Sequence, residues 1–356
     1  MPEHSLERGL NWILAQQSSD GCWRTDAFGQ LKEGNASTAL VLDTLTQLPE
    51  SYWPRVRGAC RKGIDFLRPR LTAFVTSPFT STPRIEFPIY TVALFLSAIQ
   101  RRFPDEHREL KRGLTSLLLK QQRTVINGWK EGRDDLGGWG AWHERVEDPG
   151  AVESANVSCT RMAVQALSLS EAIDSEVATN AQGFLQRCRP ESATEATGSG
   201  FFFTPDEKSM LNKKGTASSD NGAEQAVPYL SPTCDGILSL ILLGAGVESA
   251  EIQKLLRVAG SMSLDVPPIP PIPDDTPPSA AASVFYYGAA ALGALWKCTQ
   301  SPELSGIRAQ YLELLQKRQL ENGSWENPLP WFQENAPLIA TALALQAQSQ
   351  LLFSTE

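Results

Sequence analysis

The carboxylate with the clearest chemical setting in this sequence is Asp235, in Ser231-Pro232-Thr233-Cys234-Asp235-Gly236 at the start of an apolar segment. Serine followed by proline is a good helix start, and the helix dipole favours a carboxylate in the first turn. The dipole also lowers a carboxyl pKa, which increases acid strength but leaves the group mostly ionised at neutral pH. Two interpretations stay open: Asp235 stabilises the helix start, or it is a catalytic acid that faces a cavity.

The other candidate catalytic or ligand-binding residues lack the companion residues that a known motif would require. Asp134 and Asp135 lack the third Asp of a diphosphate-binding Asp-Asp-x-x-Asp motif, and no glycine-rich phosphate loop occurs. No cofactor is therefore expected. Five further candidates have a simpler explanation as a solvated turn, a loop residue or a small buried side chain: Asp274, Asp275, His143, Cys159 and Cys234.

Aromatic residues gather at or near the starts of the apolar segments. Their π faces could line a cavity and stabilise a carbocation there, whereas the alternative is ordinary core packing. The candidate substrate-binding residues of this group are Tyr90, Trp139, Trp142, Tyr229, Phe285, Tyr286, Tyr287 and Trp331. Since three of them are consecutive, at least one of the rings at 285–287 must face away from any ligand.

Two kinds of helix alternate along the chain and must position these residues. Helices of the first kind have one charged face, which suits an outer position; those of the second are apolar or small on nearly every face and must be covered all round. The pattern predicts outer helices over 5–17, 55–68, 107–122, 174–188, 249–260 and 302–319. It predicts inner helices over 35–48, 88–100, 155–170, 231–246, 279–298 and 334–349.

Six pairs of an outer and an inner helix predict an all-α fold, an (α/α)6 barrel, because a closed ring covers every inner helix. Residues 1–356 are expected to form one domain, with inner helices parallel around a central cavity. Irregular insertions are expected around 123–154, 190–230 and 264–278. The second is polar and the third is proline-rich, and either could cover one mouth of the barrel.

Composition limits the function classes. The 356 residues are 42% apolar and 20% charged with a net charge of −8, which indicates a globular protein and argues against a nucleic-acid partner. The start lacks a signal-peptide pattern and the six cysteines form no CxxC pair, so a cytoplasmic location with reduced thiols is expected. Peripheral membrane contact is a further expectation, through apolar residues at 71–75 or 201–203.

A repeated segment carries a family resemblance. Gln17-x-x-x-Gly21-x-Trp23 has the spacing of Gln319-x-x-x-Gly323-x-Trp325, with fainter copies between them that include Gln121 and the Gly137-Gly138-Trp139 turn. These segments resemble the QW-type repeats of the squalene cyclase and protein prenyltransferase superfamily, with the size of a single barrel. The resemblance implies a cavity that handles isoprenoids, so an isoprenoid small molecule or lipid is the expected partner.

The catalytic signatures depart from that family. The Asp-x-Asp-Asp motif of class II cyclases matches Asn156-Val157-Ser158-Cys159, which lacks the protonating carboxylates. Ser158 is kept as a candidate substrate-binding residue. The zinc-ligand positions of the prenyltransferases match Ala281 and Ser283, so no metal site is expected.

Two hypotheses of different class follow. The first is a single-domain terpene or triterpene cyclase of class II type with a non-standard acid, for which Asp235 is the candidate. The second is a non-catalytic superfamily member that binds a polyprenyl or hopanoid lipid or a protein partner. A zinc-dependent prenyltransferase subunit is a third idea, which bound metal would reveal.

Overall fold

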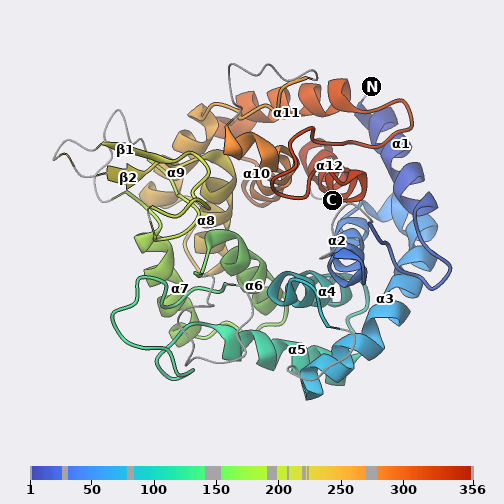
Figure 1. The fold of residues 1–356 in the computed structure, drawn as a ribbon, viewed down its shortest axis with the longest axis horizontal. Coiled ribbons are helices and arrows are strands. Elements are labelled where there is room, and N and C mark those ends of the chain that lie inside the picture. The colour runs from blue at the N-terminus through green and yellow to red at the C-terminus, as the bar shows by residue number, and fades with distance from the viewer. Residues whose placement is uncertain are drawn as a thin grey trace.

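Two concentric rings of helices form the molecule (Figure 1). The computed structural model describes residues 2–25, 31–77, 84–140, 154–190, 199–206, 208–218, 222, 224–269 and 279–353. The inner helices are α2 (Asn35–Thr46), α4 (Pro88–Arg102), α6 (Val157–Leu169), α8 (Leu230–Leu242), α10 (Phe285–Thr299) and α12 (Pro337–Leu352). Each of them packs against the next, and α12 returns to α2, so the inner ring is closed.

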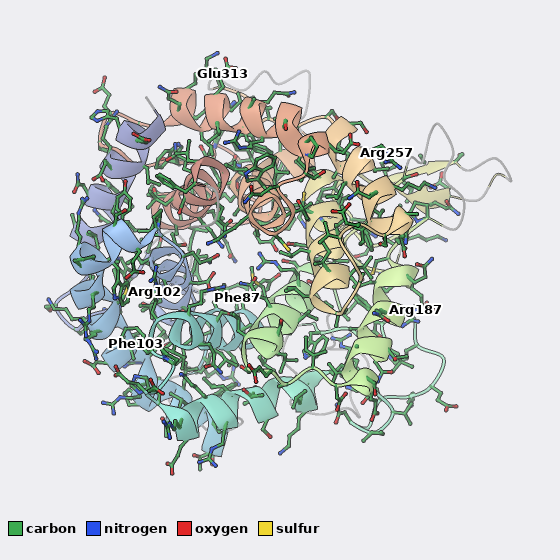
Figure 2. The ribbon with its side chains drawn as sticks, turned by 180° about the vertical axis from the view of Figure 1, so that it is seen from behind. Phe87, Arg102, Phe103, Arg187, Arg257 and Glu313 are labelled. Atoms are coloured by element: carbon green, nitrogen blue, oxygen red, sulfur yellow. The ribbon has the colours of Figure 1, made fainter. Side chains whose placement is uncertain are left out.

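The outer ring alternates with the inner ring along the chain. Its helices are α1 (Pro2–Ala15), α3 (Trp53–Thr76), α5 (Arg108–Gln121), α7 (Ser175–Arg187), α9 (Ala250–Ser261) and α11 (Ser305–Arg318). Figure 2 shows Arg187, Arg257 and Glu313 on this outer ring and Phe87 beside the central space. The predicted (α/α)6 barrel is confirmed, because the inner helices are buried on nearly every face.

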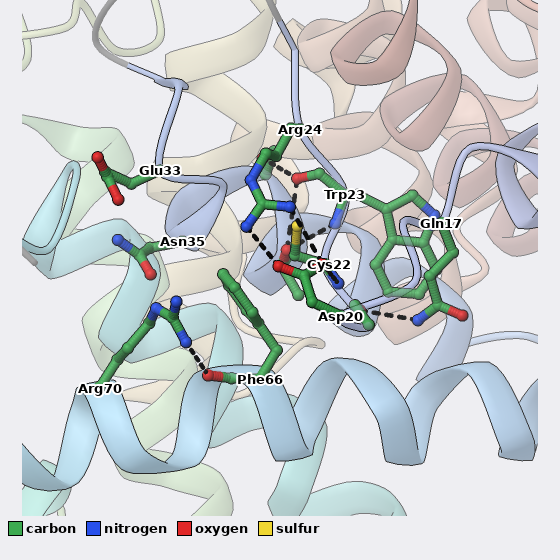
Figure 3. A network of polar contacts seen from close by, with 12 residues as sticks. Gln17, Asp20, Cys22, Trp23, Arg24, Glu33, Asn35, Phe66 and Arg70 are labelled. Carbon is green, nitrogen blue, oxygen red and sulfur yellow. Dashed lines mark hydrogen bonds and ion pairs between the residues drawn. The ribbon is translucent and has the colours of Figure 1, made fainter.

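A glycine turn after α1 has the same geometry as the turn after α11. Gln17 Nε2 donates to the Gly21 carbonyl at 2.8 Å and to the Ala59 carbonyl of α3 at 2.9 Å (Figure 3). Trp23 is fully buried; its indole donates to the Ile13 carbonyl at 2.7 Å and its backbone N–H to Thr38 at 2.9 Å. The turn therefore links one outer helix to the next and to an inner helix.

The second turn closes the ring. Gln319 Nε2 donates to the Gly323 carbonyl and to the Ser5 carbonyl of α1, each at 2.8 Å. Trp325 repeats the contacts of Trp23: the indole donates to the Leu315 carbonyl at 2.7 Å and the backbone N–H to Thr341 at 3.0 Å. The end of the last outer helix is thereby joined to the first.

A third turn keeps these contacts with a long insertion. Gln122 Nε2 donates to the Gly137 carbonyl at 3.0 Å and to the Val177 carbonyl of α7 at 3.1 Å, and Trp139 donates to Thr160 at 3.1 Å. The glutamine of this copy is therefore Gln122, and the sequence assignment to Gln121 was wrong. Gly137 has φ +89°, and a Cβ there would lie 1.9 Å from a carbonyl oxygen of α7, so glycine is required.

The remaining differences from the predicted elements lie at their ends and in the insertions. Residues 280–284 form a 3₁₀ helix, η3 (Ala280–Val284), and two more, η2 (Glu50–Tyr52) and η4 (Pro302–Leu304), precede outer helices. Insertion 190–230 contains an antiparallel hairpin of β1 (Thr216–Ser218) and β2 (Glu224–Ala226). Such short strands carry little periodicity in the sequence. Most of the proline-rich stretch, 270–278, lies outside the described residues.

Replacing Gln319 by alanine should destabilise the protein, because the carbonyl groups of Ser5 and Gly323 would lose their donor. We expect the free energy of unfolding in urea to fall by about 1–2 kcal/mol. Gln316→Ala is the matched control, since Gln316 lies on the same helix with an exposed side chain. Equal stability of the two variants would contradict the closing role of Gln319.

Candidate functional site

A cavity of about 320 Å³ lies at the end of the barrel where the inner helices begin. Residues at or near the starts of all six inner helices line it, including Ala36, Tyr90, Ser158, Ser231, Tyr287 and Ile339. Its aromatic lining residues are Phe87, Tyr90, Phe203, Tyr229, Tyr287, Trp331 and Phe332. This size falls within the range of small-molecule sites, about 300–1,000 Å³.

A buried polar network backs one wall of the cavity. Asp235 is 1% exposed and accepts a hydrogen bond from Arg161 Nε at 3.0 Å and one from the Tyr287 hydroxyl at 2.6 Å. The hydroxyl of Ser158 bonds that of Tyr287, and Arg161 also donates to Gln165 at 2.6 Å. The network therefore fixes two hydroxyl groups, Ser158 and Tyr287, on the cavity wall.

The charge state of Asp235 follows from its surroundings. Burial raises the pKa of Asp235, and the charge of Arg161 and the hydrogen bond from Tyr287 oppose this shift. Burial is the largest single effect and would lower the pKa of Arg161, but the charges of Asp235 and Tyr287 and the hydrogen bond to Asp235 together raise that pKa. The geometry is thus an ion pair, with Asp235 behind Tyr287 rather than among the lining residues.

Glu334 is a lining residue that the sequence analysis missed. It is 1% exposed, and its carboxylate accepts the backbone N–H groups of Tyr286 at 3.0 Å and Tyr287 at 2.7 Å, as well as the Asn327 amide at 3.0 Å. Burial raises the pKa of Glu334 to about 7, although these donors favour the charged form. Among the described lining residues it is the one carboxyl group.

A second glutamate repeats this arrangement away from the cavity lining. Glu86 accepts the backbone N–H groups of Asn35 at 2.9 Å and Ala36 at 3.3 Å, at the start of α2. Each glutamate precedes the proline that begins the next inner helix, Pro88 after Glu86 and Pro337 after Glu334. A glutamate two or three residues before such a proline is the sequence signal that could have identified both capping residues.

Only some of the predicted substrate-binding residues line the cavity. Tyr90, Ser158, Tyr229, Tyr287 and Trp331 line the cavity, and their contact with a substrate stays a prediction. The other placed residues lie elsewhere: Trp139 is buried in the third turn, Phe285 packs on Tyr311 with centroids 5.2 Å apart, and Tyr286 donates to the Glu326 carbonyl. Trp142 lies outside the described residues.

Among the other candidate chemical groups, Cys159 lines the cavity and Cys234 is fully buried. Asp135 pairs with Arg123 and with Arg133 beside the third turn. Asp274, Asp275 and His143 fall in ranges that the structure does not describe. Within the described ranges no three His, Cys, Asp or Glu side chains are grouped in a way that could hold a metal ion.

The segments expected to contact a membrane are largely buried. Leu71, Phe74, Phe201 and Phe202 are at most 2% exposed and belong to the hydrophobic core, so they cannot form a surface patch. The prediction that residues 71–75 or 201–203 form an apolar membrane patch was therefore wrong. None of the described helices combines the length and apolar character that a membrane span requires.

Comparisons with known proteins support the fold. No family model and no curated protein matches the sequence. Similar solved structures include the type II terpene cyclase MstE from Scytonema in complex with geranylgeranyl dihydroxybenzoate, its substrate (TM-score 0.62, 14% identity, covering 98% of this chain and 97% of that one). An α-1,6-mannanase from a Salegentibacter species is similar to nearly the same degree (TM-score 0.60, 14% identity, 99% and 100% covered). At these identities the likeness shows the α/α barrel alone.

The raised pKa of Glu334 predicts a pH-dependent stability. A carboxyl group whose pKa is higher in the folded than in the unfolded state favours folding below its unfolded pKa, and this contribution is lost as pH rises through the folded value. Between pH 4.5 and about 7, the free energy of unfolding should lose roughly 3 kcal/mol from this group. Urea unfolding at several pH values measures it.

The matched variants for this test are Glu334→Gln and Glu326→Gln. Glu326 is exposed, so its variant should follow the wild-type pH profile, whereas Glu334→Gln should flatten the profile over that interval. If the free energy of unfolding of Glu334→Gln falls with pH as steeply as that of the wild type, the pH dependence comes from other groups.

Proposed function

We propose that the cavity binds an isoprenoid and that the protein acts on it as a terpene cyclase of class II type. The observation that carries this proposal is an apolar, aromatic-lined cavity with a single carboxyl group among its described lining residues. Aromatic faces stabilise carbocations, and the fold resembles a cyclase that takes a geranylgeranyl substrate. We also propose that the three turns are QW-type repeats of the squalene cyclase superfamily.

The similarity to a mannanase suggests glycoside hydrolysis as an alternative function. The number of carboxyl groups that line the cavity favours the cyclase function instead. Glycosidases use two carboxyl groups, roughly 5–10 Å apart, on either side of the scissile bond. Glu334 has no such partner among the described lining residues, and the wall is dominated by apolar and aromatic side chains. A hydrocarbon chain suits this surface better than a sugar does.

Glu334 is the acid that we propose for the first step. With a pKa near 7 it carries its proton for much of the time at neutral pH. Its O–H bond breaks, the proton forms a C–H bond with the π electrons of an alkene, and the next double bond attacks the resulting cation. The N–H groups of Tyr286, Tyr287 and Asn327 stabilise the carboxylate left behind. Loss of a proton to water ends the cyclisation.

Asp235, the acid proposed from the sequence, fits a positioning role better in this geometry. Asp235 forms a buried ion pair with Arg161 and accepts a hydrogen bond from Tyr287, so its carboxylate faces these two groups rather than the cavity. It fixes the Tyr287 hydroxyl at the wall. The Asp235 hypothesis remains testable beside the Glu334 one, since each predicts a different inactive variant.

A non-catalytic lipid-binding function is the second candidate. It is favoured by one observation: Asn156, which stands in the segment matched to the cyclase acid motif, serves as the cap of α6 and accepts the Cys159 N–H at 2.8 Å. The segment matched to the acid motif therefore caps a helix in this protein and supplies no acid. The cavity itself would serve this function equally well.

Incubation with farnesyl, geranylgeranyl and squalene-type substrates tests the proposal. Cyclised products should form with the wild type, and Glu334→Gln should lower turnover by about 10²-fold or more because the proton donor is lost. Glu86→Gln is the matched control: it removes a similar helix cap outside the lining and should retain activity. Full activity of Glu334→Gln would exclude this acid, and saturable binding without any product would favour the lipid-binding function.

We further propose that the cavity mouth contacts a membrane, from which an isoprenoid would enter. Met210 is 93% exposed next to the lining residue Leu211, and Trp331 lines the cavity while remaining 50% exposed. Exposed apolar side chains beside a lipid-sized cavity suit an interfacial position.

Serine at both Met210 and Trp331 should weaken co-sedimentation with phosphatidylcholine vesicles about tenfold, because apolar area that inserts is lost. Leu169→Ser is the control: Leu169 is also exposed, but at the opposite end of α6 from the cavity. Equal vesicle binding by the wild type and the double variant would end the membrane proposal.

A further inference from the structure

The cavity wall contains a buried cation, Lys213, that the proposed function has not used. Lys213 is 7% exposed and is the one cationic side chain among the described lining residues. It lies three residues before the hairpin strand β1, in the insertion that was expected to cover one mouth of the barrel. A positive charge at this depth costs desolvation energy, and a negative ligand group beside it would offset part of that cost.

Among the described residues, four groups contact the Lys213 ammonium at the wall. Its Nζ lies 4.1 Å from the centroid of the Phe203 ring and 4.3 Å from that of Phe332. It also lies 3.3 Å from the Leu211 carbonyl oxygen and 3.5 Å from the Tyr229 hydroxyl. Since all four residues line the cavity, the ammonium itself is placed at the cavity surface.

The inner-helix starts add to this positive potential. The N-terminal end of a helix carries a partial positive charge, and residues at or near all six inner-helix starts line the cavity. Two of these ends already hold carboxylates: α2 holds that of the half-buried Glu86, and α10 holds that of the buried Glu334. The partial positive charges of the helix ends therefore add to the charge of Lys213 in attracting a negative group.

We infer that the ligand is an amphiphile whose anionic head group, a carboxylate or a phosphate, pairs with Lys213 while its isoprenoid tail occupies the apolar part of the cavity. The inference rests on the proposed isoprenoid function and adds the head-group class to it. The head group would approach between the Phe203 and Phe332 rings, which keep water from the pair. A charge pair in so dry a site is screened little by salt.

Binding of a matched set of ligands tests the inference: farnesoic acid, farnesyl monophosphate, farnesol and farnesylamine share one tail and differ in the head. By calorimetry the wild type should bind at least one of the two anions about tenfold or more tightly than farnesol, and farnesylamine most weakly. The stronger anion identifies the head group. This order needs no variant and so survives any folding defect of one.

Three variants locate the charge. Lys213→Met should abolish the preference for the anion over farnesol, whereas Lys213→Arg should keep it. Lys214→Met is the matched control, because Lys214 pairs with Asp265 at 2.8 Å and is not a described lining residue. Its ligand preference should equal that of the wild type.

The outcomes separate the inference from the function on which it rests. Equal affinity of the wild type for anion and alcohol, or a preference that persists in Lys213→Met, overturns the inference and leaves isoprenoid binding intact. If none of the four ligands binds the wild type, the proposed isoprenoid function fails, and the head-group inference fails with it.

Discussion

The whole structure depends on covering six helices that are apolar on nearly every face. A single helix of this kind cannot be stable beside water, and a row of them would still expose its two ends, so the row must close. Closure brings residues over three hundred positions apart into contact: Gln319 with Ser5, Gln348 with Ser5, and Gln350 with Gln47 at 2.6 Å. These polar contacts give a largely non-directional core a defined register.

The same closure creates the site. When every inner helix begins at one end, the unpaired N–H groups of all first turns converge there, and each needs an acceptor. Glu86, Asn156 and Glu334 supply acceptors for α2, α6 and α10. Polar and titratable groups therefore gather at this end of an otherwise apolar barrel. The chemistry of the cavity is in this sense a consequence of how the helices start.

The sequence predicted the parts of the fold that periodic burial controls. The alternation of charged-face and all-apolar segments predicted each helix, and the spacing from Gln319 to Trp325 predicted the closing turn. The site was predicted only in part. The contact from Glu334 to the N–H of Tyr287 joins the loop before α12 to the start of the neighbouring helix α10, and such a contact leaves no periodic pattern in the sequence of either segment. The partner of Asp235, Arg161, was missed for the same reason: an arginine in an apolar helix is interpretable only once the facing carboxylate is known.

Comparison of Asp235 and Glu334 shows why burial alone does not define a proton donor. Both carboxyl groups are 1% exposed, and burial raises the pKa of each. Their partners differ, since Asp235 faces the full charge of Arg161, whereas Glu334 accepts hydrogen bonds from neutral N–H groups. A full opposite charge holds a carboxyl group in its ionised form, while neutral donors stabilise the anion without enforcing it. Glu334 can therefore change its protonation state near neutral pH in the place where a ligand would lie, and Asp235 is better suited to hold Tyr287 still.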